Sequence, residues 1–343
     1  MSDTDLIIGQ TRELPATAQE HAGQVANYVA AKHAFSDYQD RKAANTLTVQ
    51  RQALQSFTDY LALAGTEPGD LFMDPEAWRG VTWGLVEGFV KWLLQRGYSL
   101  ATVNVRLSTV KVYAKLAAKA GAIEPQDLAM IQTVSGYRHS EAKNIDATRD
   151  TTRRGLKKAD WTVITPQQAE QLKRQADTPQ GRRDAVIMTV LIDHGLRVSE
   201  LARLTVGDVD LENNELRFYR PKTDDQDKHW LTPDSREALR AYMTQDAPAI
   251  GPLLKASHRH GGLTKRGMSI RAISARVKVL GQAIGIEHLS PHDLRHFGAT
   301  DLARNNTPLD RLQAWGGWNS VAMPMAYIER AEHGNEGVIY GSA

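Results

Sequence analysis

The sequence predicts a mainly α-helical protein of the α+β class, with an N-terminal helical bundle and a mostly helical second domain that holds one small antiparallel β-sheet. Three observations favour this class. Apolar residues recur at helical spacing over residues 31–135. Thr-Pro and Ser-Pro pairs that recur in the second half are typical of helix starts. Between residues 203 and 232, an alternating pattern replaces the helical period.

Composition limits the class of protein. The chain has 343 residues, enough for about two domains, and its 41% apolar and 24% charged residues are typical of an ordered globular protein. The absence of Cys excludes disulfides, a thiol nucleophile and Cys-bound zinc. No apolar run is long enough to span a membrane, and the first residues do not form a secretory signal. We therefore expect a cytoplasmic protein with no membrane partner.

The first half is predicted as a tail and a bundle. Residues 1–30 read as a flexible N-terminal tail, although Ala18–Tyr38 has the pattern of a first helix. In Ala44–Leu63, apolar residues fall near one helix face. Gly97 ends the next helix, and Ser99 caps a third. These helices form the predicted bundle, residues 31–135.

Residues 136–162 are predicted to link the two domains. The helical period disappears here, and seven Lys or Arg face four Asp or Glu, the only clear basic excess in the chain. The basic residues closest together are Arg153, Arg154, Lys157 and Lys158. Two interpretations remain open: a solvated surface loop, or a basic linker lying along a DNA phosphate backbone.

The second half contains marked helix starts and one hairpin. Capping residues precede proline at Thr165, Thr232, Ser290 and Thr307, and Gln168, Asp293 and Asp310 stand three residues after three of these caps. Leu216 and Phe218 alternate with polar residues, which predicts a strand and a hairpin with Lys222 at or near its turn.

Several classes of site find no support in the sequence. HExxH, GxxxxGK[ST], GxGxxG and GxSxG are all absent. The pair His258 and His260 reads as solvated loop residues. What remains is a series of polar residues in the C-terminal half: GLRVSEL with Arg197, HDLRH with His292 and Arg295, and GGWNS with Trp318, followed nine residues later by Tyr327.

Together and in this order, these segments resemble the tyrosine recombinase (phage integrase) family. The resemblance is specific over Arg183–Arg330 and looser over residues 30–135, where it implies a SAM-like core-binding DNA domain. It further implies a catalytic domain over residues 163–330. Residues 331–343 begin polar and end with the apolar Val338, Ile339 and Tyr340, and two interpretations remain open: a disordered tail, or a tail exchanged between protomers.

The resemblance also implies the role of each residue. Arg197 and Arg295 are the two family arginines, and Glu200 is the acid that follows the first. Lys222 is the hairpin lysine, with Lys228 as a competitor. His292 is the histidine of HxxR, and Tyr327 is the nucleophile. Trp318 stands where most members have His, which points to the Cre-like branch.

The chemistry of these groups suits phosphoryl transfer without metal, cofactor or ATP. Two guanidiniums can bind the non-bridging oxygens of a phosphate, and a tyrosine hydroxyl with a usual pKa of about 10 needs cationic neighbours and a proton acceptor. His292 can accept that proton, and Lys222 can protonate the 5′ oxygen that leaves. Trp318 cannot carry protons, so we expect it to orient the phosphate and pack the site.

The expected function is site-specific recombination through a 3′-phosphotyrosyl intermediate. The expected partner is double-stranded DNA with inverted-repeat half-sites, bound by a homotetramer on synapsed DNA that forms from free monomers. The expected setting is a prokaryotic cytoplasm, in association with the nucleoid. Two alternatives remain: a type IB topoisomerase-like relaxing enzyme, and a DNA-binding protein without transesterase activity.

We also predict the position or role of three further residues. His296 is expected to point away from His292 and to pack or form hydrogen bonds behind the site. Pro324 is expected to prevent an uninterrupted helix before Tyr327. Tyr340 matches no family segment and is expected to be a packing residue.

Overall fold

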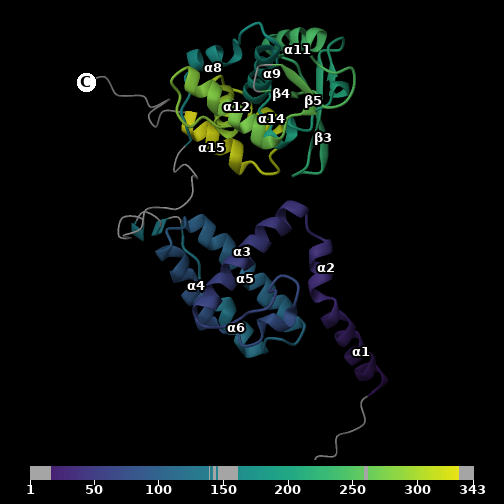
Figure 1. Cartoon of the computed structure of the whole chain (residues 1–343), viewed down its shortest axis with the longest axis vertical. Helices are drawn as coiled ribbons and strands as arrows, with labels where there is room; N and C mark the ends of the chain where they lie inside the picture. Colours follow the sequence, from purple (N-terminus) through teal and green to yellow (C-terminus); the bar gives the residue numbers. More distant parts are fainter. Residues whose placement is uncertain (1–16, 139, 142–143, 146–160, 259–261, 332–343) are drawn as a thin grey trace, which may run out of the picture. The chain divides into compact units, whose positions relative to one another are not determined.

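The chain folds as two compact units, Met1–Lys157 and Lys158–Ala343. The computed structural model describes residues 17–138, 140–141, 144–145, 161–258 and 262–331 (Figure 1). The linker residues Arg153, Arg154, Lys157 and Lys158 therefore lie outside the described residues, as do His260, Tyr340 and all of the predicted tail after Ala331.

Unit 1 is a helical bundle. Its α-helices are α1 (Ala18–Lys32), α2 (Ala34–Asp40), α3 (Ala44–Leu63), α4 (Trp83–Gln95), α5 (Leu100–Lys119) and α6 (Pro125–Thr133), with a 3₁₀ turn at Pro75–Trp78. The core is rich in aromatic rings, and the Phe57 and Phe89 rings lie 5.0 Å apart. The Ser99 hydroxyl caps α5 by accepting the Thr102 N–H, as predicted.

The start of unit 1 differs from the expected flexible tail. Helix α1 begins at Ala18, where Thr17 and Glu20 form a capping box, so residues 18–30 of that tail are helical. His33 then separates α1 from α2, so the pattern over Ala18–Tyr38 corresponds to two helices. No residue of α1 is buried, and its helical state therefore depends on local capping more than on packing.

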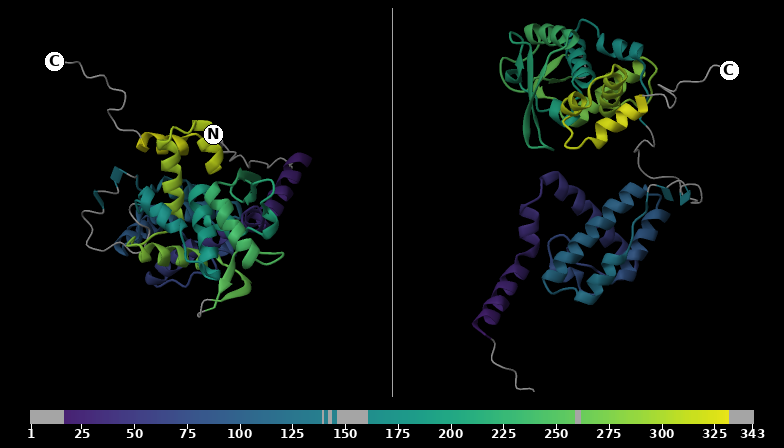
Figure 2. Two further views of the ribbon diagram at one scale, coloured as in Figure 1. Left: turned by 90° about the horizontal axis from the view of Figure 1, so that it is seen from above. Right: turned by 180° about the vertical axis from the view of Figure 1, so that it is seen from behind.

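Unit 2 is helical with two small sheets. Its α-helices are α8 (Pro166–Lys173), α9 (Pro179–Asp193), α10 (Val198–Leu201), α11 (Pro233–Gln245), α12 (Ile270–Ala283), α13 (Pro291–Arg304), α14 (Leu309–Gly316) and α15 (Ala322–Ala331). Helix α9 is the central element, because it packs against α8, α11, α12 and α13. The strands lie to one side of the unit, and α8, α12 and α15 lie on the other (Figures 1 and 2).

The predicted hairpin is present. Strands β1 (Val209–Asp210), β2 (Glu215–Arg220) and β3 (Asp225–Trp230) form an antiparallel sheet in that order, and Lys222 lies in the turn between β2 and β3. A second two-stranded sheet, β4 (Lys255–Ser257) with β5 (Leu263–Gly267), was not expected. Its strands are short and largely polar, so they lack the apolar alternation that reveals a strand in sequence.

Three of the four predicted helix starts hold. Thr165 with Gln168 and Ser290 with Asp293 form capping boxes, and Thr232 caps α11. The prediction for Thr307 and Asp310 is wrong, because Pro308 is extended (ψ 144°) and is itself the residue before α14. Within the residues that the structure describes, no helix is both long enough and apolar enough to cross a membrane.

Candidate active site

The first site arginine is placed by a left-handed glycine. Helix α9 ends at Asp193, and Gly195 then adopts φ +58°. A Cβ at Gly195 would lie 2.3 Å from the Trp315 ring, so both the backbone conformation and the space require glycine. This turn brings Arg197 to the residue before α10, with a quarter of its side chain exposed.

Glu200 is the buried acid of the site. One of its carboxylate oxygens accepts the Arg197 N–H at 2.8 Å, and the other accepts an Arg197 guanidinium N–H at 2.7 Å. The carboxylate also lies 3.5 Å from an Arg220 guanidinium nitrogen. Glu200 therefore contacts two arginines of the site, and its burial makes these partners necessary.

Arg220, at the end of β2, is a site residue that sequence reasoning missed. Its side chain is buried and donates to Asp227 at 2.7 Å, to the Trp315 carbonyl at 2.9 Å and to the Gly316 carbonyl at 3.4 Å. A signal was present, because Arg220 follows Leu216 and Phe218 on the buried face of the strand. A charged side chain on the buried face of a strand needs hydrogen-bond or ion-pair partners inside the protein.

Arg295, on α13, completes the cationic cluster. Its guanidinium donates to the carbonyl of Gly195, in the turn before Arg197. It also donates to the carbonyl of Gly316, which accepts a hydrogen bond from Arg220 as well. Burial, together with the positive charges of Arg197 and Arg220, lowers the pKa of Arg295 to about 10. Three guanidiniums thus converge, and an anion is their natural ligand.

The two candidate lysines lie in different parts of the hairpin, Lys228 in strand β3 and Lys222 in the turn. Lys228 pairs with Arg217 across the hairpin, on the face opposite to Phe218 and Arg220, and it lies 3.6 Å from Glu215. Lys222 is exposed in the turn, two residues after Arg220. Among the described residues, none forms a hydrogen bond or ion pair with Lys222, so the structure does not join it to the arginine cluster.

Tyr327 lies on α15 and is almost fully buried, at 3% exposed. Its hydroxyl is 2.7 Å from His296 Nδ1, and its ring is 5.5 Å from Trp318. The Arg295 guanidinium lies 5.0 Å from the Trp318 ring. Trp318 therefore stands between the tyrosine and the arginine cluster, and the expected packing role fits this contact.

The expectation that His296 points away from His292 is wrong. Its Nε2 lies 2.9 Å from His292 Nε2, and the two rings are 4.2 Å apart. Residues four apart lie on one face of a helix, so His296 points along the same face of α13 as His292. The family pattern names only the first of these histidines, and the contact with Tyr327 depends on how α13 packs against α15.

Pro324 does not interrupt the helix before Tyr327, contrary to expectation. Helix α15 starts at Ala322, which puts the proline in its first turn, and it continues to Ala331. N–H groups in the first turn have no partner within the helix, so proline costs little there.

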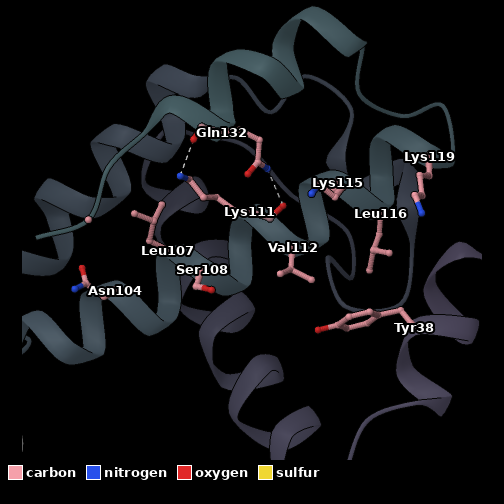
Figure 3. A pocket seen from close by; sticks show the side chains of 11 residues that line it. Tyr38, Asn104, Leu107, Ser108, Lys111, Val112, Lys115, Leu116, Lys119 and Gln132 are labelled. Carbon is pink, nitrogen blue, oxygen red and sulfur yellow. Dashed lines mark hydrogen bonds between the residues drawn. The ribbon is translucent and has the colours of Figure 1, made fainter. Parts of the chain in front are cut away.

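Unit 1 has a basic groove of its own, shown in Figure 3. The groove, about 720 Å³ in volume, is lined along α5 by Lys111, Lys115 and Lys119, with Tyr38 and Gln132 on other elements. Lys111 donates to the Gln132 carbonyl at 2.8 Å, and burial lowers its pKa. Lys115 and Lys119 are exposed, one turn apart, and available to an anionic partner.

The site geometry indicates anion chemistry in which a tyrosine takes part. Within the described part of the chain, no group of three His, Asp or Glu side chains is arranged to hold a metal ion.

Comparison with known proteins shows which family the chain belongs to. The model of the phage integrase family matches residues 162–333, half of the chain.

The chain belongs to the phage integrase family. The recombinase is similar to tyrosine recombinase XerC of Herpetosiphon aurantiacus, with 25% identity over 82% of this chain and 84% of the relative. Tyrosine recombinase XerD of Neisseria meningitidis is 30% identical over 52% of this chain and 62% of its own length. The predicted family and an enzyme that cleaves and rejoins DNA are thereby confirmed.

Solved structures support the fold of the recombinase. An integrase of the Tn1549 transposon bound to a circular intermediate DNA aligns with a TM-score of 0.60 at 17% identity, over 87% of this chain and 94% of the other. A lambda integrase dimer bound to a core site aligns with a TM-score of 0.60 at 13% identity, over 96% and 84% of the two chains. The predicted mostly helical fold with a small sheet is confirmed.

Proposed function

We propose that this recombinase cleaves one DNA strand at a time by attack of Tyr327 on a phosphodiester, which leaves a 3′-phosphotyrosyl bond and a free 5′ hydroxyl. The observation that carries the proposal is the convergence of a buried tyrosine hydroxyl and three arginines in one small region of unit 2. The bond energy stays in the phosphotyrosine, so religation needs no ATP.

The arginines have separate tasks in this proposal. Arg197 is the most exposed of the three and binds a non-bridging phosphate oxygen from the DNA side. Arg295 binds the second oxygen with the guanidinium N–H groups that its two carbonyl partners leave over. Arg220 already donates to Asp227 and to two backbone carbonyls, so its proposed task is to add positive potential.

Lys222 is the proposed general acid. An exposed lysine in a β-turn can approach the 5′ oxygen once DNA is bound, and protonation turns a poor alkoxide leaving group into an alcohol. The opposite orientation and the Glu215 ion pair of Lys228 favour this choice. Trp318 packs against Tyr327 and presents one indole N–H, while His292 belongs to the proton path.

The remaining proposals concern assembly and DNA contacts. Recombination of two duplexes needs four cleavages, which a homotetramer on paired sites with inverted-repeat half-sites provides. The apolar residues Val338, Ile339 and Tyr340 of the tail are proposed to dock on a neighbouring protomer. The lysines of the α5 groove and the basic linker would contact DNA phosphates. The Trp318-based placement in a Cre-like branch and an association with the nucleoid stay predictions.

A nicked suicide substrate tests the proposal, because loss of the short 5′ fragment traps the covalent intermediate. The wild-type protein is expected to form a protein–DNA adduct, and Tyr327→Phe is expected to form none while its DNA affinity stays within a few-fold. Adduct formation by Tyr327→Phe would show that another residue, such as Tyr340, is the nucleophile. A two-site assay then separates recombination from simple relaxation.

A further inference from the structure

Two histidines of α13 lie beside the proposed nucleophile, Tyr327. His292 and His296 lie one turn apart on α13, and Tyr327 reaches them from α15. The Tyr327 hydroxyl is 2.7 Å from His296 Nδ1, and the opposite ring nitrogen of His296 is 2.9 Å from His292 Nε2. His296 therefore stands between the tyrosine and His292, with one nitrogen on each.

A neutral imidazole has one N–H donor and one acceptor nitrogen, and this determines the direction of the chain. If the Tyr327 hydroxyl donates to Nδ1 of His296, then Nε2 of His296 carries the proton and donates to His292. Every contact in this arrangement pairs one donor with one acceptor. The same three groups can then pass a proton from one end to the other by exchanging which atom of each contact holds the hydrogen.

We propose that His296 is a catalytic residue that relays the Tyr327 proton to His292 when the tyrosine attacks. This inference rests on the proposed function, in which Tyr327 is the nucleophile. As the Tyr327 oxygen bonds to phosphorus, its O–H bond breaks and an N–H bond forms at His296 Nδ1. The Nε2–H bond of His296 breaks and its proton joins His292 Nε2, while the 5′ oxygen leaves with a proton from Lys222.

After this step, the transferred proton is on His292 and His296 is neutral. His292 becomes an imidazolium, so the positive charge ends on the residue three positions before Arg295, on one helix face with it. His296 is neutral again, with Nδ1–H directed at the tyrosine oxygen. In religation the same path runs backwards and returns the proton to Tyr327, as microscopic reversibility requires.

The surroundings of His296 hold its ring in place. The Trp161 ring stacks on the His296 ring, with centroids 5.1 Å apart and an angle of 18° between planes. The next residue, Thr162, donates its backbone N–H to Asp293 at 3.0 Å, and Asp293 belongs to the capping box that starts α13. An indole face also favours a cation, so this stack stabilises the protonated ring during transfer. Trp161 is therefore a positioning residue.

Adduct formation on the nicked substrate tests the relay. His296→Ala should slow cleavage by about 100- to 10,000-fold, the usual contribution of a positioned acid or base. His296→Asn keeps a polar group near Nδ1 but cannot pass a proton, so it should be about as slow. Recovery of most of the rate in His296→Asn would overturn the relay, since a hydrogen bond alone would then suffice. The exposed His21 on α1 provides a matched control in His21→Ala.

The pH profile separates proton transfer from a structural role. The usual tyrosine pKa is about 10, so the deficit of both His296 variants should shrink as pH rises from 7 toward 9.5 because the tyrosine ionises by itself. The charged groups that line the adjoining cavity are Asp301 and Arg304. A deficit that stays constant with pH would overturn the proposal.

Two further comparisons sharpen the result. The loss in the double variant His292→Ala with His296→Ala should be smaller than the product of the two single losses, because both residues serve one path. Multiplicative losses would contradict a shared path.

A substrate with sulfur at the 5′ bridging position should not restore cleavage by His296→Ala, since His296 does not protonate the leaving group. An adduct in Tyr327→Phe would instead refute the proposed nucleophile, a failure that is distinguishable from failure of the relay.

Discussion

At the scale of single residues, the site depends on the balance between its arginine and carboxylate charges. Arg197, Arg220 and Arg295 are brought together in a largely buried region, where Glu200 and Asp227 neutralise part of their repulsion. Three guanidiniums facing two carboxylates leave a net positive charge, which favours binding of a phosphate. Glu200 thus preserves the geometry, and the arginines supply the binding.

Lys222→Ala should cleave ordinary DNA slowly, because an unprotonated 5′ oxygen is a poor leaving group. A substrate with sulfur at the 5′ bridging position should restore most of the rate, since a thiolate leaves without a proton. Lys228→Ala, which removes a lysine from the other face of the same hairpin, is the matched control and should cleave both substrates normally. Lack of rescue in Lys222→Ala would refute its role as the acid.

A buried histidine makes the stability of unit 2 depend on pH. His194 is 1% exposed, its Nε2 lies 2.9 Å from the Ser235 hydroxyl, and burial together with nearby Lys173 lowers its pKa from 6.5 to about 4. The unfolded chain therefore binds the proton more readily. The stability is fully present above pH 6.5 and falls as pH drops toward 4, by on the order of 3 kcal/mol.

Urea unfolding of the full chain at pH 7, 6 and 5 measures this effect. His194→Gln keeps a polar group near Ser235 but does not titrate, so its midpoint should depend less on pH than that of the wild type. Burial also lowers the pKa of the neighbouring His229, so part of the slope should remain in the variant. Equal slopes in wild type and variant would assign the pH dependence to other groups.

At the scale of elements, the start of α13 is the most important junction. Asp293 accepts hydrogen bonds from the Ser290 N–H at 2.8 Å, from the Ser290 hydroxyl at 2.7 Å and from the Thr162 N–H at 3.0 Å. The capping box therefore also fixes the chain segment that carries Trp161. Since His292 flanks Asp293, the cap and the proton path share one turn of helix.

Ser290→Ala should cost about 1 kcal/mol of unfolding free energy, as expected for a lost helix cap. Asp293→Ala should cost more, about 2–3 kcal/mol, because a charged acceptor of three hydrogen bonds is removed. Urea denaturation of the two variants checks the difference. Equal losses would mean that the bond to Thr162 adds nothing to stability.

At the scale of the whole molecule, unit 1 is expected to contribute DNA affinity through charge. Each lysine that contacts a phosphate releases counterions, so Lys115→Gln and Lys119→Gln should each reduce the slope of log affinity against log salt by about 1. Lys91→Gln is the control, because Lys91 is paired with Glu87 at 3.2 Å on α4. An unchanged slope in the α5 variants would place the α5 groove away from DNA.

Much of the architecture could be predicted from local signals. Helix α3 has the predicted bounds, and the caps at Ser99, Thr165, Thr232 and Ser290 act where hydroxyl residues precede a helical period. The hairpin around Lys222 follows from alternation over a few residues. These features depend on interactions within about four residues along the chain, which a single sequence carries in full.

The sequence by itself therefore determined the family, the starts of several helices, the position of the hairpin and most of the residue types of the site. Only the tertiary structure decided that Arg220 joins the arginine cluster and that His296 touches Tyr327. Both results depend on contacts between residues 31 and more than 90 positions apart in the chain. Such contacts are set by how helices and strands pack, and no local period or spacing encodes that packing.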